Sequence, residues 1–399
     1  MKAPIKFTFE GKEVKVVDDY TYLGVIFNFN GCFKKAIENQ KTVALRAMQA
    51  LLTKIRLLVL DVDTSIELFH RCVMPILLYG SEVWAFDTNN IATLDVLYKG
   101  FLKQILHIHI STPTCMVFGE TGQPRLQRLI AQRQVGFWAK LKFDAVPRLS
   151  KLILPALVGL HGNRTSRTII SKDKTRKALK FDFKWITTLR HTLDHLGMGY
   201  IFDTFCLSEP REVLAEVKRR FADSSTQVWR SEVDEHQLCV NYRMFKREWG
   251  MSPYLTVLPE PQRTWLTKFR TRCHNLPICQ NKFTKPDAPT QLKLCNLCNM
   301  NEIGDEFHYI FKCNAFSAKR KKLISPYFCE RPNIIKYQEL FESPDPEILY
   351  KLANFTHVVM NSFPYDKPQT PERLQESYTT RAGRVTKRPV RLADSLVAY

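Results

Sequence analysis

The chain has 399 residues, 45% of them hydrophobic and 25% charged. This composition predicts a globular protein of two or three domains with enough apolar material for a core. A total of 59 Lys and Arg against 39 Asp and Glu gives a net charge of +20, which attracts polyanions and favours nucleic acid as partner. A ribosome-associated, a membrane-surface or a merely basic soluble protein would share this charge. Since no run of about 18 apolar residues occurs, we expect no membrane span.

The eleven cysteines are odd in number and mostly scattered among apolar residues. That pattern suits a reducing compartment better than a disulfide framework. The first residues also lack the apolar segment of a secretory signal. We therefore expect an intracellular soluble protein, nuclear, cytoplasmic or both. Isolated buried thiols are predicted at Cys32, Cys72, Cys115, Cys206 and Cys239.

Short strands are predicted at the beginning of the chain. Residues 5–9 and 14–16 alternate on either side of a turn at 10–12, and a third apolar run covers 22–27. Three short strands alone make a thin sheet. Residues 1–32 are therefore interpreted as the trailing edge of a domain whose body lies upstream.

Helical periodicity begins at Phe33 and predicts a bundle over residues 33–145. Apolar residues first recur at three- and four-residue spacing up to Leu58. A second helix is expected to start with N-cap chemistry at residues 63–65 and to run through Pro75 to Leu77. Further helices are predicted at 91–105 and 126–141. Short connections between these helices favour a small bundle.

The second half of the chain changes character three times. Residues 163–190 are the most basic region, and we assign 146–255 to a basic helical linker domain. Prolines near residue 255 mark a boundary, and a cysteine-rich C-terminal domain is expected over 256–363. The polar segment 364–399 is predicted to be a disordered basic tail. The expected fold class is mainly α, with short β-hairpins and a small metal-binding module.

A Cys-x2-Cys pair is the strongest local signal. Cys295 and Cys298 are followed by His308 and Cys313. Four thiolate and imidazole ligands suit one tetrahedral Zn²⁺, and four filled positions indicate a structural rather than a catalytic site. Residues 290–320 have few large apolar side chains, so their ordering is predicted to depend on this zinc.

Two features surround this pattern. Upstream, Cys273, His274 and Cys279 could supply a second metal, although unliganded core thiols are the favoured interpretation. Around the histidine, a small core on the metal is expected from Phe307, Tyr309, Ile310 and Phe311.

Several runs resemble parts of non-LTR, LINE-type retrotransposon reverse transcriptases. Residues 19–27 (DYTYLGVIF) resemble the end of the palm, and residues 75–84 (PILLYGSEVW) resemble the thumb segment that ends in Tyr-Gly-x-Glu-x-Trp. Residues 102–115 resemble the stretch that follows the thumb segment. The Cys-Cys-His-Cys module resembles the knuckle near the family's C-terminus, and all four occur in the family's order.

The resemblance implies palm-end strands at 1–32, a thumb-like bundle at 33–145 and a zinc knuckle. It implies binding of element RNA and nicked target DNA, possible partnership with upstream palm and endonuclease domains, and a parent RNA-directed DNA polymerase that uses Mg²⁺. The family's catalytic carboxylates do not carry over. Asp18 and Asp19 lack the third carboxylate that two-metal chemistry needs, so no catalytic residue is assigned. The alternative is a domesticated zinc-stabilised adaptor that binds RNA or protein.

Nucleic-acid contacts are predicted where cations gather, because contacts with phosphate position a backbone without reading its sequence. A solvated charged face is the alternative at each position, and the last group could also be a nuclear localisation patch. The three groups lie on the first helix, in the basic region and after the knuckle: Lys34, Lys35, Lys41 and Arg46; Arg164, Arg167, Lys174, Arg176, Lys177, Lys180 and Lys184; Lys319, Arg320, Lys321 and Lys322.

Overall fold

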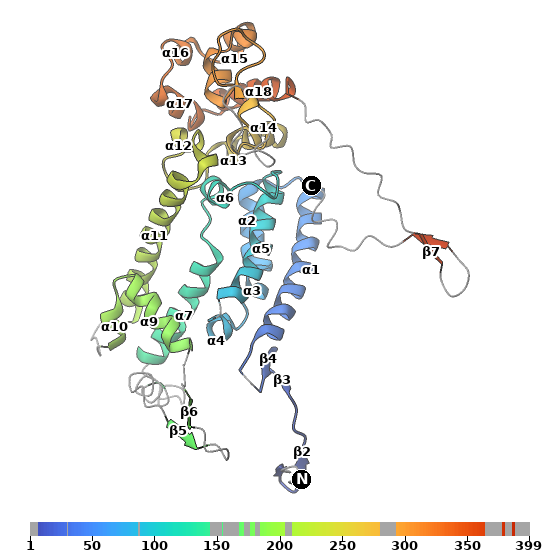
Figure 1. Ribbon diagram of the computed structural model, residues 1–399, viewed down its shortest axis with the longest axis vertical. Coiled ribbons are helices and arrows are strands. Elements are labelled where there is room, and N and C mark those ends of the chain that lie inside the picture. The colour runs from blue at the N-terminus through green and yellow to red at the C-terminus, as the bar shows by residue number, and fades with distance from the viewer. Residues whose placement is uncertain are drawn as a thin grey trace. The chain divides into compact units, whose positions relative to one another are not determined.

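The structure, a computed structural model, is mainly helical, as the sequence predicts (Figure 1). It describes residues 7–29, 31–86, 88–143, 154, 167–170, 176–179, 184–203, 210–279, 293–363, 377–379 and 385–387. The chain divides into two compact units. Unit 1 comprises residues 1–57, 67–98 and 124–227, and unit 2 comprises residues 58–66, 99–123 and 228–399. The contiguous domains expected from the sequence differ from this division, since each unit collects three separate segments.

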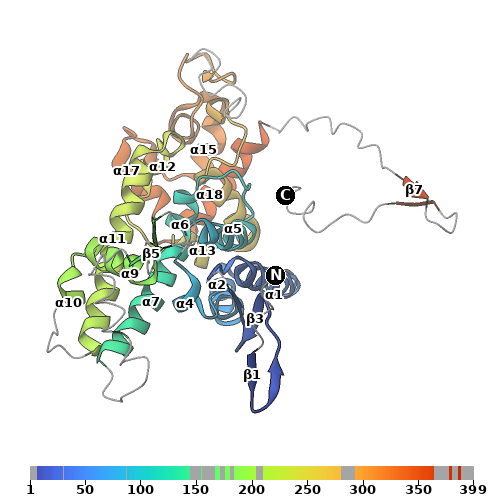
Figure 2. The ribbon, with the colours of Figure 1, turned by 60° about the horizontal axis from the view of Figure 1, so that its bottom comes forward.

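The N-terminal strands form two hairpins that precede the first helix of unit 1 (Figure 2). Strand β1 (Phe7–Phe9) pairs with β2 (Lys12–Val14), and β3 (Asp19–Tyr22) pairs with β4 (Val25–Asn28), both antiparallel. The run at 22–27 is therefore not one strand, as expected, but the second hairpin. Its turn residues Leu23 and Gly24 have φ of 46° and 80°, as a two-residue type I′ turn requires.

Three of the four helices predicted between residues 33 and 145 match the structure closely. These are α1 (Lys34–Leu58), α5 (Thr88–Ile105) and α7 (Leu126–Phe143). The helix predicted over 63–77 is instead divided into α2 (Val62–Cys72) and α3 (Met74–Leu77), and α4 (Ser81–Trp84) follows. Pro75 lies in the first turn of α3, where a missing N–H costs nothing.

The N-cap of α2 also differs from the prediction. The Asp61 carboxylate accepts the Thr64 amide at 2.8 Å and the Thr64 hydroxyl at 2.8 Å. Asp61, and not residues 63–65, therefore satisfies the free amide groups at the start of the helix.

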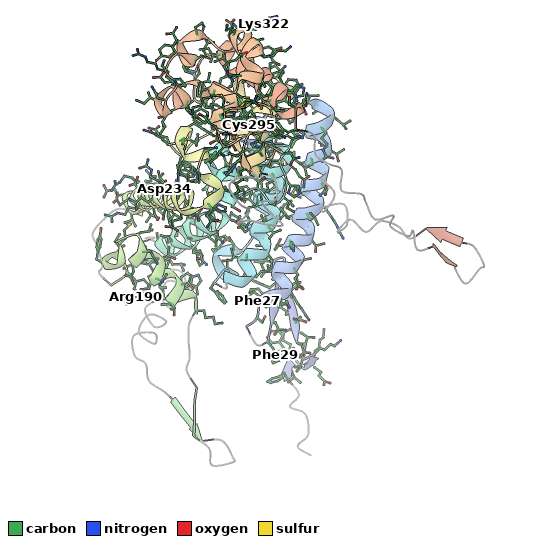
Figure 3. The ribbon with its side chains drawn as sticks, turned by 45° about the horizontal axis from the view of Figure 1, so that its top comes forward. Phe27, Phe29, Arg190, Asp234, Cys295 and Lys322 are labelled. Carbon is green, nitrogen blue, oxygen red and sulfur yellow. The ribbon has the colours of Figure 1, made fainter. Side chains whose placement is uncertain are left out.

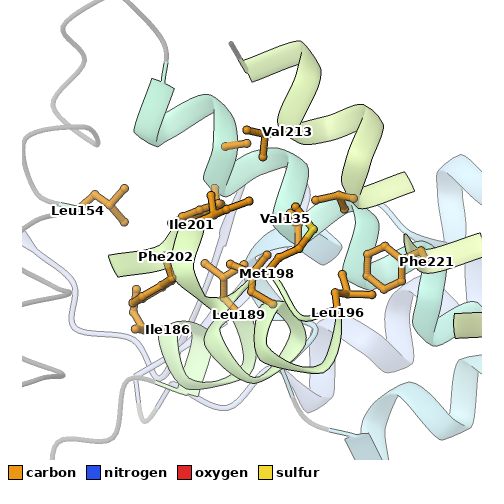
Figure 4. Packing of buried hydrophobic residues seen from close by; sticks show 14 residues of the cluster. Val135, Leu154, Ile186, Leu189, Leu196, Met198, Ile201, Phe202, Val213 and Phe221 are labelled. Carbon is orange, nitrogen blue, oxygen red and sulfur yellow. The ribbon is translucent and has the colours of Figure 1, made fainter. Parts of the chain in front are cut away.

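The core of unit 1 beyond residue 124 joins α7 to α9 (Lys184–His195), α10 (Gly199–Asp203) and α11 (Pro210–Glu235) (Figure 4). Trp138 and Phe202 stack there with ring centroids 6.0 Å apart. The basic region was expected to be helical. Two of its segments, β5 (Arg167–Ile170) and β6 (Arg176–Leu179), instead pair as an antiparallel hairpin.

Unit 2 is built from short helices around two longer ones. Helix α14 (Glu260–Arg270) packs on α18 (Pro346–Asn361), which also contacts α15 (Ser317–Leu323) and α17 (Ile334–Phe341). The remaining described elements are α6 (Thr114–Thr121), η1 (Gln237–Cys239), α12 (Tyr242–Phe245), α13 (Tyr254–Val257), η2 (Pro277–Cys279), η4 (His308–Lys312), η5 (Asn314–Phe316), α16 (Pro326–Cys329) and the hairpin of β7 (Ser377–Thr379) with β8 (Val385–Lys387). The rest of the tail predicted to be disordered lies outside the described residues.

A buried ion network ties α6 to α14. The Arg270 guanidinium donates to both carboxylate oxygens of Glu120, at 2.9 and 3.0 Å, and neither side chain is exposed. Arg270 also donates to Glu342 at 2.5 Å and to the Phe341 carbonyl at 2.8 Å. Such bidentate, charge-assisted bonds are the stronger kind, and they satisfy a charge that could not otherwise be buried.

The prediction of isolated buried thiols is only partly correct. Cys32 and Cys72 are exposed. Cys115 and Cys239 are buried, but their sulfur atoms lie 3.5 Å apart, so they form a pair. Cys206 lies outside the described residues. Among the helices that the structure describes, none combines the length and apolarity that crossing a membrane requires.

Candidate metal centre and nucleic-acid surface

The four predicted ligands of the knuckle lie together in unit 2, where Figure 3 marks Cys295. Their donor atoms are all within 4.8 Å of one another. The sulfur atoms of Cys295 and Cys313 are 3.8 Å apart, and the Cys298 sulfur is 3.4 Å from Nε2 of His308. In a zinc tetrahedron with bonds of about 2.3 Å to sulfur and 2.0 Å to nitrogen, these edges would measure about 3.8 and 3.5 Å. The residues therefore fit the ion.

Local backbone bonds bring the two halves of the site together. The Cys295 amide donates to the Glu302 carbonyl at 2.9 Å, which closes the loop that carries the Cys-x2-Cys pair. On the other side, the His308 amide donates to the Asp305 carboxylate at 2.8 Å. The Cys313 amide donates to the His308 carbonyl at 2.9 Å. This five-residue spacing is that of a π-turn, which is common at functional sites, and it returns Cys313 to the side of His308.

Glu302 orients the imidazole of His308. Its Oε2 lies 3.0 Å from Nδ1 of His308, and its Oε1 accepts from Lys312 at 3.0 Å. The hydrogen bonds from Lys312 and His308 hold the pKa of Glu302 below its ordinary value. A carboxylate on Nδ1 fixes the tautomer that leaves Nε2 free to bind a metal. No spacing rule in the sequence singles out Glu302 for this role.

The thiols of the site influence one another's ionisation. Burial opposes ionisation of Cys295, but Tyr309, the Leu297 amide, Cys298 and His308 favour the thiolate and lower its pKa to about 7. Burial and then the neighbouring Cys295 raise the pKa of Cys313 to about 12. Negative charge on one sulfur thus opposes charge on the next, and a divalent cation relieves that repulsion because it binds thiolates.

Aromatic packing supports only one half of the knuckle. Of the four residues predicted to form a core here, Tyr309, Ile310 and Phe311 are buried and Phe307 is half-buried. The ring of Tyr309 lies 5.1 Å from that of Phe363, and the ring of Phe311 lies 5.7 Å from that of Tyr337. The prediction that zinc orders residues 290–320 stays a prediction, and the packing narrows it. The segment 307–316 packs against α17 and the end of α18, so the dependence on zinc is expected in 293–304.

Arg320 is not part of an exposed cationic surface. Its guanidinium is buried and donates to the carbonyl groups of Ile310, Tyr309 and Cys313 at 2.7, 3.1 and 2.8 Å. Arg320 thus caps the turn that carries two ligands. Its neighbours on α15 are exposed: Lys319, Lys321 and Lys322, the last marked in Figure 3.

The other predicted cations are placed as follows. On α1, Lys34, Lys35 and Arg46 are exposed and Lys41 is half-buried, while Lys35 also bonds to Asp19. Lys184 is exposed at the start of α9. Arg167, Arg176 and Lys177 lie in β5 and β6. The structure does not describe Arg164, Lys174 and Lys180.

The upstream residues considered for a second metal separate in the structure. Cys273 lies 2.9 Å from the Thr112 hydroxyl, whereas His274 and Cys279 meet Glu306, which the sequence analysis did not single out. Comparisons with family models, with curated proteins and with solved structures found no match to this chain.

Proposed function

We propose that this chain is the nucleic-acid-binding C-terminal part of a non-LTR, LINE-type reverse transcriptase, with one structural zinc in its knuckle. The main support is a contact in unit 1 between the two runs that resemble the palm end and the thumb. The Tyr79 hydroxyl of the second run donates to the Leu23 carbonyl of the first at 2.8 Å. A Cβ at Gly80 would lie 3.0 Å from a methyl group of Val25. The two runs, whose contacting residues are 56 positions apart in the chain, are thus in direct contact in the fold.

Tyr79, Gly80 and Trp84 of the thumb-like run lie at this contact, whereas Glu82 faces α7. Gly80 has φ of 69°, which favours glycine, and precedes α4. The buried indole of Trp84 donates to the Tyr79 carbonyl at 2.8 Å. Glu82 lies 3.6 Å from the Arg133 guanidinium. The pattern Tyr-Gly-x-Glu-x-Trp therefore fastens the β3–β4 hairpin to the helices of unit 1.

Helix α1 offers the surface for a nucleic-acid backbone. It begins six residues after β4 and contains one carboxylate, Glu38, against the cations Lys34, Lys35, Lys41, Arg46, Lys54 and Arg56. Its buried positions, among them Ala44, Met48 and Ile55, face the protein, so most of these cations remain on the solvent side. Such a surface attracts phosphate without reading bases.

The proposal is tested by removing cations from α1. We expect the triple variant Lys34→Ala, Lys41→Ala, Arg46→Ala to weaken binding to a labelled primer–template about tenfold or more, close to 1.4 kcal/mol. The matched control removes three exposed cations that already pair with carboxylates, namely Arg71, Arg219 and Lys351. Equal weakening by both variants would argue against α1 as the binding surface. A chain that binds no nucleic acid would favour the adaptor alternative.

The absence of polymerase catalysis is tested with Asp18 and Asp19, the adjacent carboxylates that could be mistaken for a catalytic pair. The Asp19 carboxylate accepts from Asn28 at 2.8 Å and bonds to Lys35. The hydrogen bond from Asn28, and after it the one from Lys35, lower the pKa of Asp19. We expect no primer extension by the purified chain with dNTPs and Mg²⁺, because Asp18 and Asp19 lack a third carboxylate. Extension that Asp18→Ala and Asp19→Ala abolish would contradict this expectation.

A further inference from the structure

A second group of ligand atoms lies in unit 2, and none of them belongs to the knuckle. His274, Cys279 and Glu306 are all buried, with exposed fractions of 2%, 5% and 2%. Their nitrogen, sulfur and oxygen donors lie within 4.8 Å of one another. We propose that these three residues hold a second divalent metal ion, for which Zn²⁺ is the best fit.

The first observation that supports a metal is the lack of hydrogen bonds to buried polar atoms of these residues. Within the part of the chain that the structure describes, neither ring nitrogen of His274 makes a hydrogen bond, and Oε1 of Glu306 accepts none either, although it forms an ion pair with Nε of Arg272 at 3.0 Å. Nε2 of His274 lies 3.2 Å from that oxygen, but not in hydrogen-bonding geometry. Buried polar groups in native proteins are nearly always satisfied, and one that is not calls for an explanation such as an ion. A metal between the three residues would take up these lone pairs.

The spacing and the chemistry of the donors are the second argument. In a tetrahedral zinc site with bonds of about 2.0 Å, the nitrogen–oxygen edge is about 3.3 Å, and the observed separation is 3.2 Å. Imidazole, thiolate and carboxylate together suit zinc better than calcium or magnesium, which prefer oxygen alone. Three protein ligands leave the fourth tetrahedral position to water.

Two neighbours hold the carboxylate of Glu306 in place. Nε of Arg272 lies 3.0 Å from Oε1, and the Asn241 amide donates to Oε2. Groups of this kind orient a ligand from outside the coordination sphere. Arg272 also sets up the competing arrangement, in which its positive charge and a protonated His274 balance Glu306 and Cys279 without any metal.

The second ion would act on the same segment as the first. Glu306 and His308 lie on either side of Phe307, the N-cap of η4, and each belongs to a different ligand group. Cys279 ends η2, whose Ile278 amide donates to the Gly304 carbonyl at 3.3 Å. The second ion would thus fasten the 304–308 segment to η2, while the knuckle fastens it to the Cys-x2-Cys loop.

Zinc stoichiometry of the full-length chain tests the proposal. After removal of loosely bound metal, we expect two zinc ions per wild-type chain by mass spectrometry. We expect one ion in Cys279→Ala, one in Cys298→Ser and none in the double variant. The matched control Cys273→Ala should keep two. A single zinc in the wild type, or two zincs that survive Cys279→Ala, would overturn the proposal.

A second measurement covers the case in which Cys279→Ala does not fold. In the double variant Cys295→Ser, Cys298→Ser, added Co²⁺ should still bind at one equivalent and give a thiolate-to-cobalt absorption band. Substituting Glu306→Gln in that background keeps the side-chain shape but removes the charge, and should weaken Co²⁺ binding at least tenfold. Absence of the band, or a band indifferent to Glu306→Gln, would show that the cluster is a metal-free ion-pair network.

Discussion

At the scale of single residues, Arg320 is a buried structural cation, whereas its neighbours Lys319, Lys321 and Lys322 on α15 are exposed. Replacing it with alanine leaves three buried carbonyl groups without their donor. We expect Arg320→Ala to lower the free energy of unfolding by about 3 kcal/mol, since hydrogen bonds to a charged donor are each worth about 1.5–3 kcal/mol. Exposed Lys321→Ala should stay within about 0.5 kcal/mol of the wild type. Urea unfolding compares the two, and equal midpoints would contradict the assigned role.

Glu302 offers a test of the knuckle that leaves all four ligands in place. Glu302→Gln removes the charge that orients His308, so the affinity for zinc should fall about tenfold to a hundredfold. The measurement is competition with a chromophoric chelator, made in the Cys279→Ala background so that the knuckle alone reports. The control is exposed Glu330→Gln. An unchanged zinc affinity in Glu302→Gln would mean that His308 needs no orienting partner.

The sequence identified the four clustered Cys and His residues but not their partners, for a physical reason. The spacing of a Cys-x2-Cys pair is itself a constraint of zinc geometry, so it is visible in the sequence. The orienting carboxylate has no fixed spacing. Glu302, Asp305 and Glu306 all lie close to His308 along the chain. Only the folded loop places Glu302 on the imidazole, Asp305 on a backbone amide and Glu306 in the second ligand group.

At the scale of elements, helices were predicted more accurately than turns. The long apolar periodicity of α1, α5 and α7 was enough to place them. The β3–β4 hairpin was missed because Leu23 occupies a left-handed conformation that leucine rarely adopts. The division between α2 and α3 was missed because Pro75 fits the first turn of a new helix as well as it interrupts an old one. Local patterns cannot choose between these outcomes without the tertiary contacts.

The ion network between α6 and α14 gives a prediction with a pH dependence. Burial opposes ionisation of Glu120, but Arg270 and Lys246 outweigh it and hold the pKa of Glu120 below its ordinary value. Its contribution to stability is therefore present above the unfolded-state pKa of about 4.3 and is lost as the pH falls toward the folded-state pKa. We expect Glu120→Gln to cost about 3–5 kcal/mol at neutral pH, since it removes one partner of a buried pair.

The control for Glu120 is Glu347, whose exposed side chain pairs with Lys351 at 2.6 Å. Glu347→Gln should change the free energy of unfolding by less than about 1 kcal/mol. The measurement is urea unfolding at neutral pH and at pH 4. The difference between Glu120→Gln and the wild type should shrink at the lower pH. A difference that is small at neutral pH, or that grows in acid, would contradict the account of the network.

At the scale of the whole molecule, the mainly helical class followed from composition and periodicity, whereas the division into units did not. Each unit is assembled from three chain segments. Where the chain leaves one unit and later comes back to it, the boundary is set by tertiary contacts and is not visible in the local composition. The same limit explains the knuckle. Residues 290–320 are not poor in large apolar side chains, but the rings that pack against their second half come from Tyr337 and Phe363, outside that window.

The central claim is that the chain binds nucleic acid through backbone phosphates, and the salt dependence of binding tests it most directly. Affinity for a labelled RNA and for DNA of the same length should be measured across salt concentrations. If four to six cations contact phosphate, log K should fall against log salt with a slope of about −3 to −5, and the slope should differ little between sequences. Binding that is flat between low and moderate salt, or that depends strongly on sequence, would contradict the account.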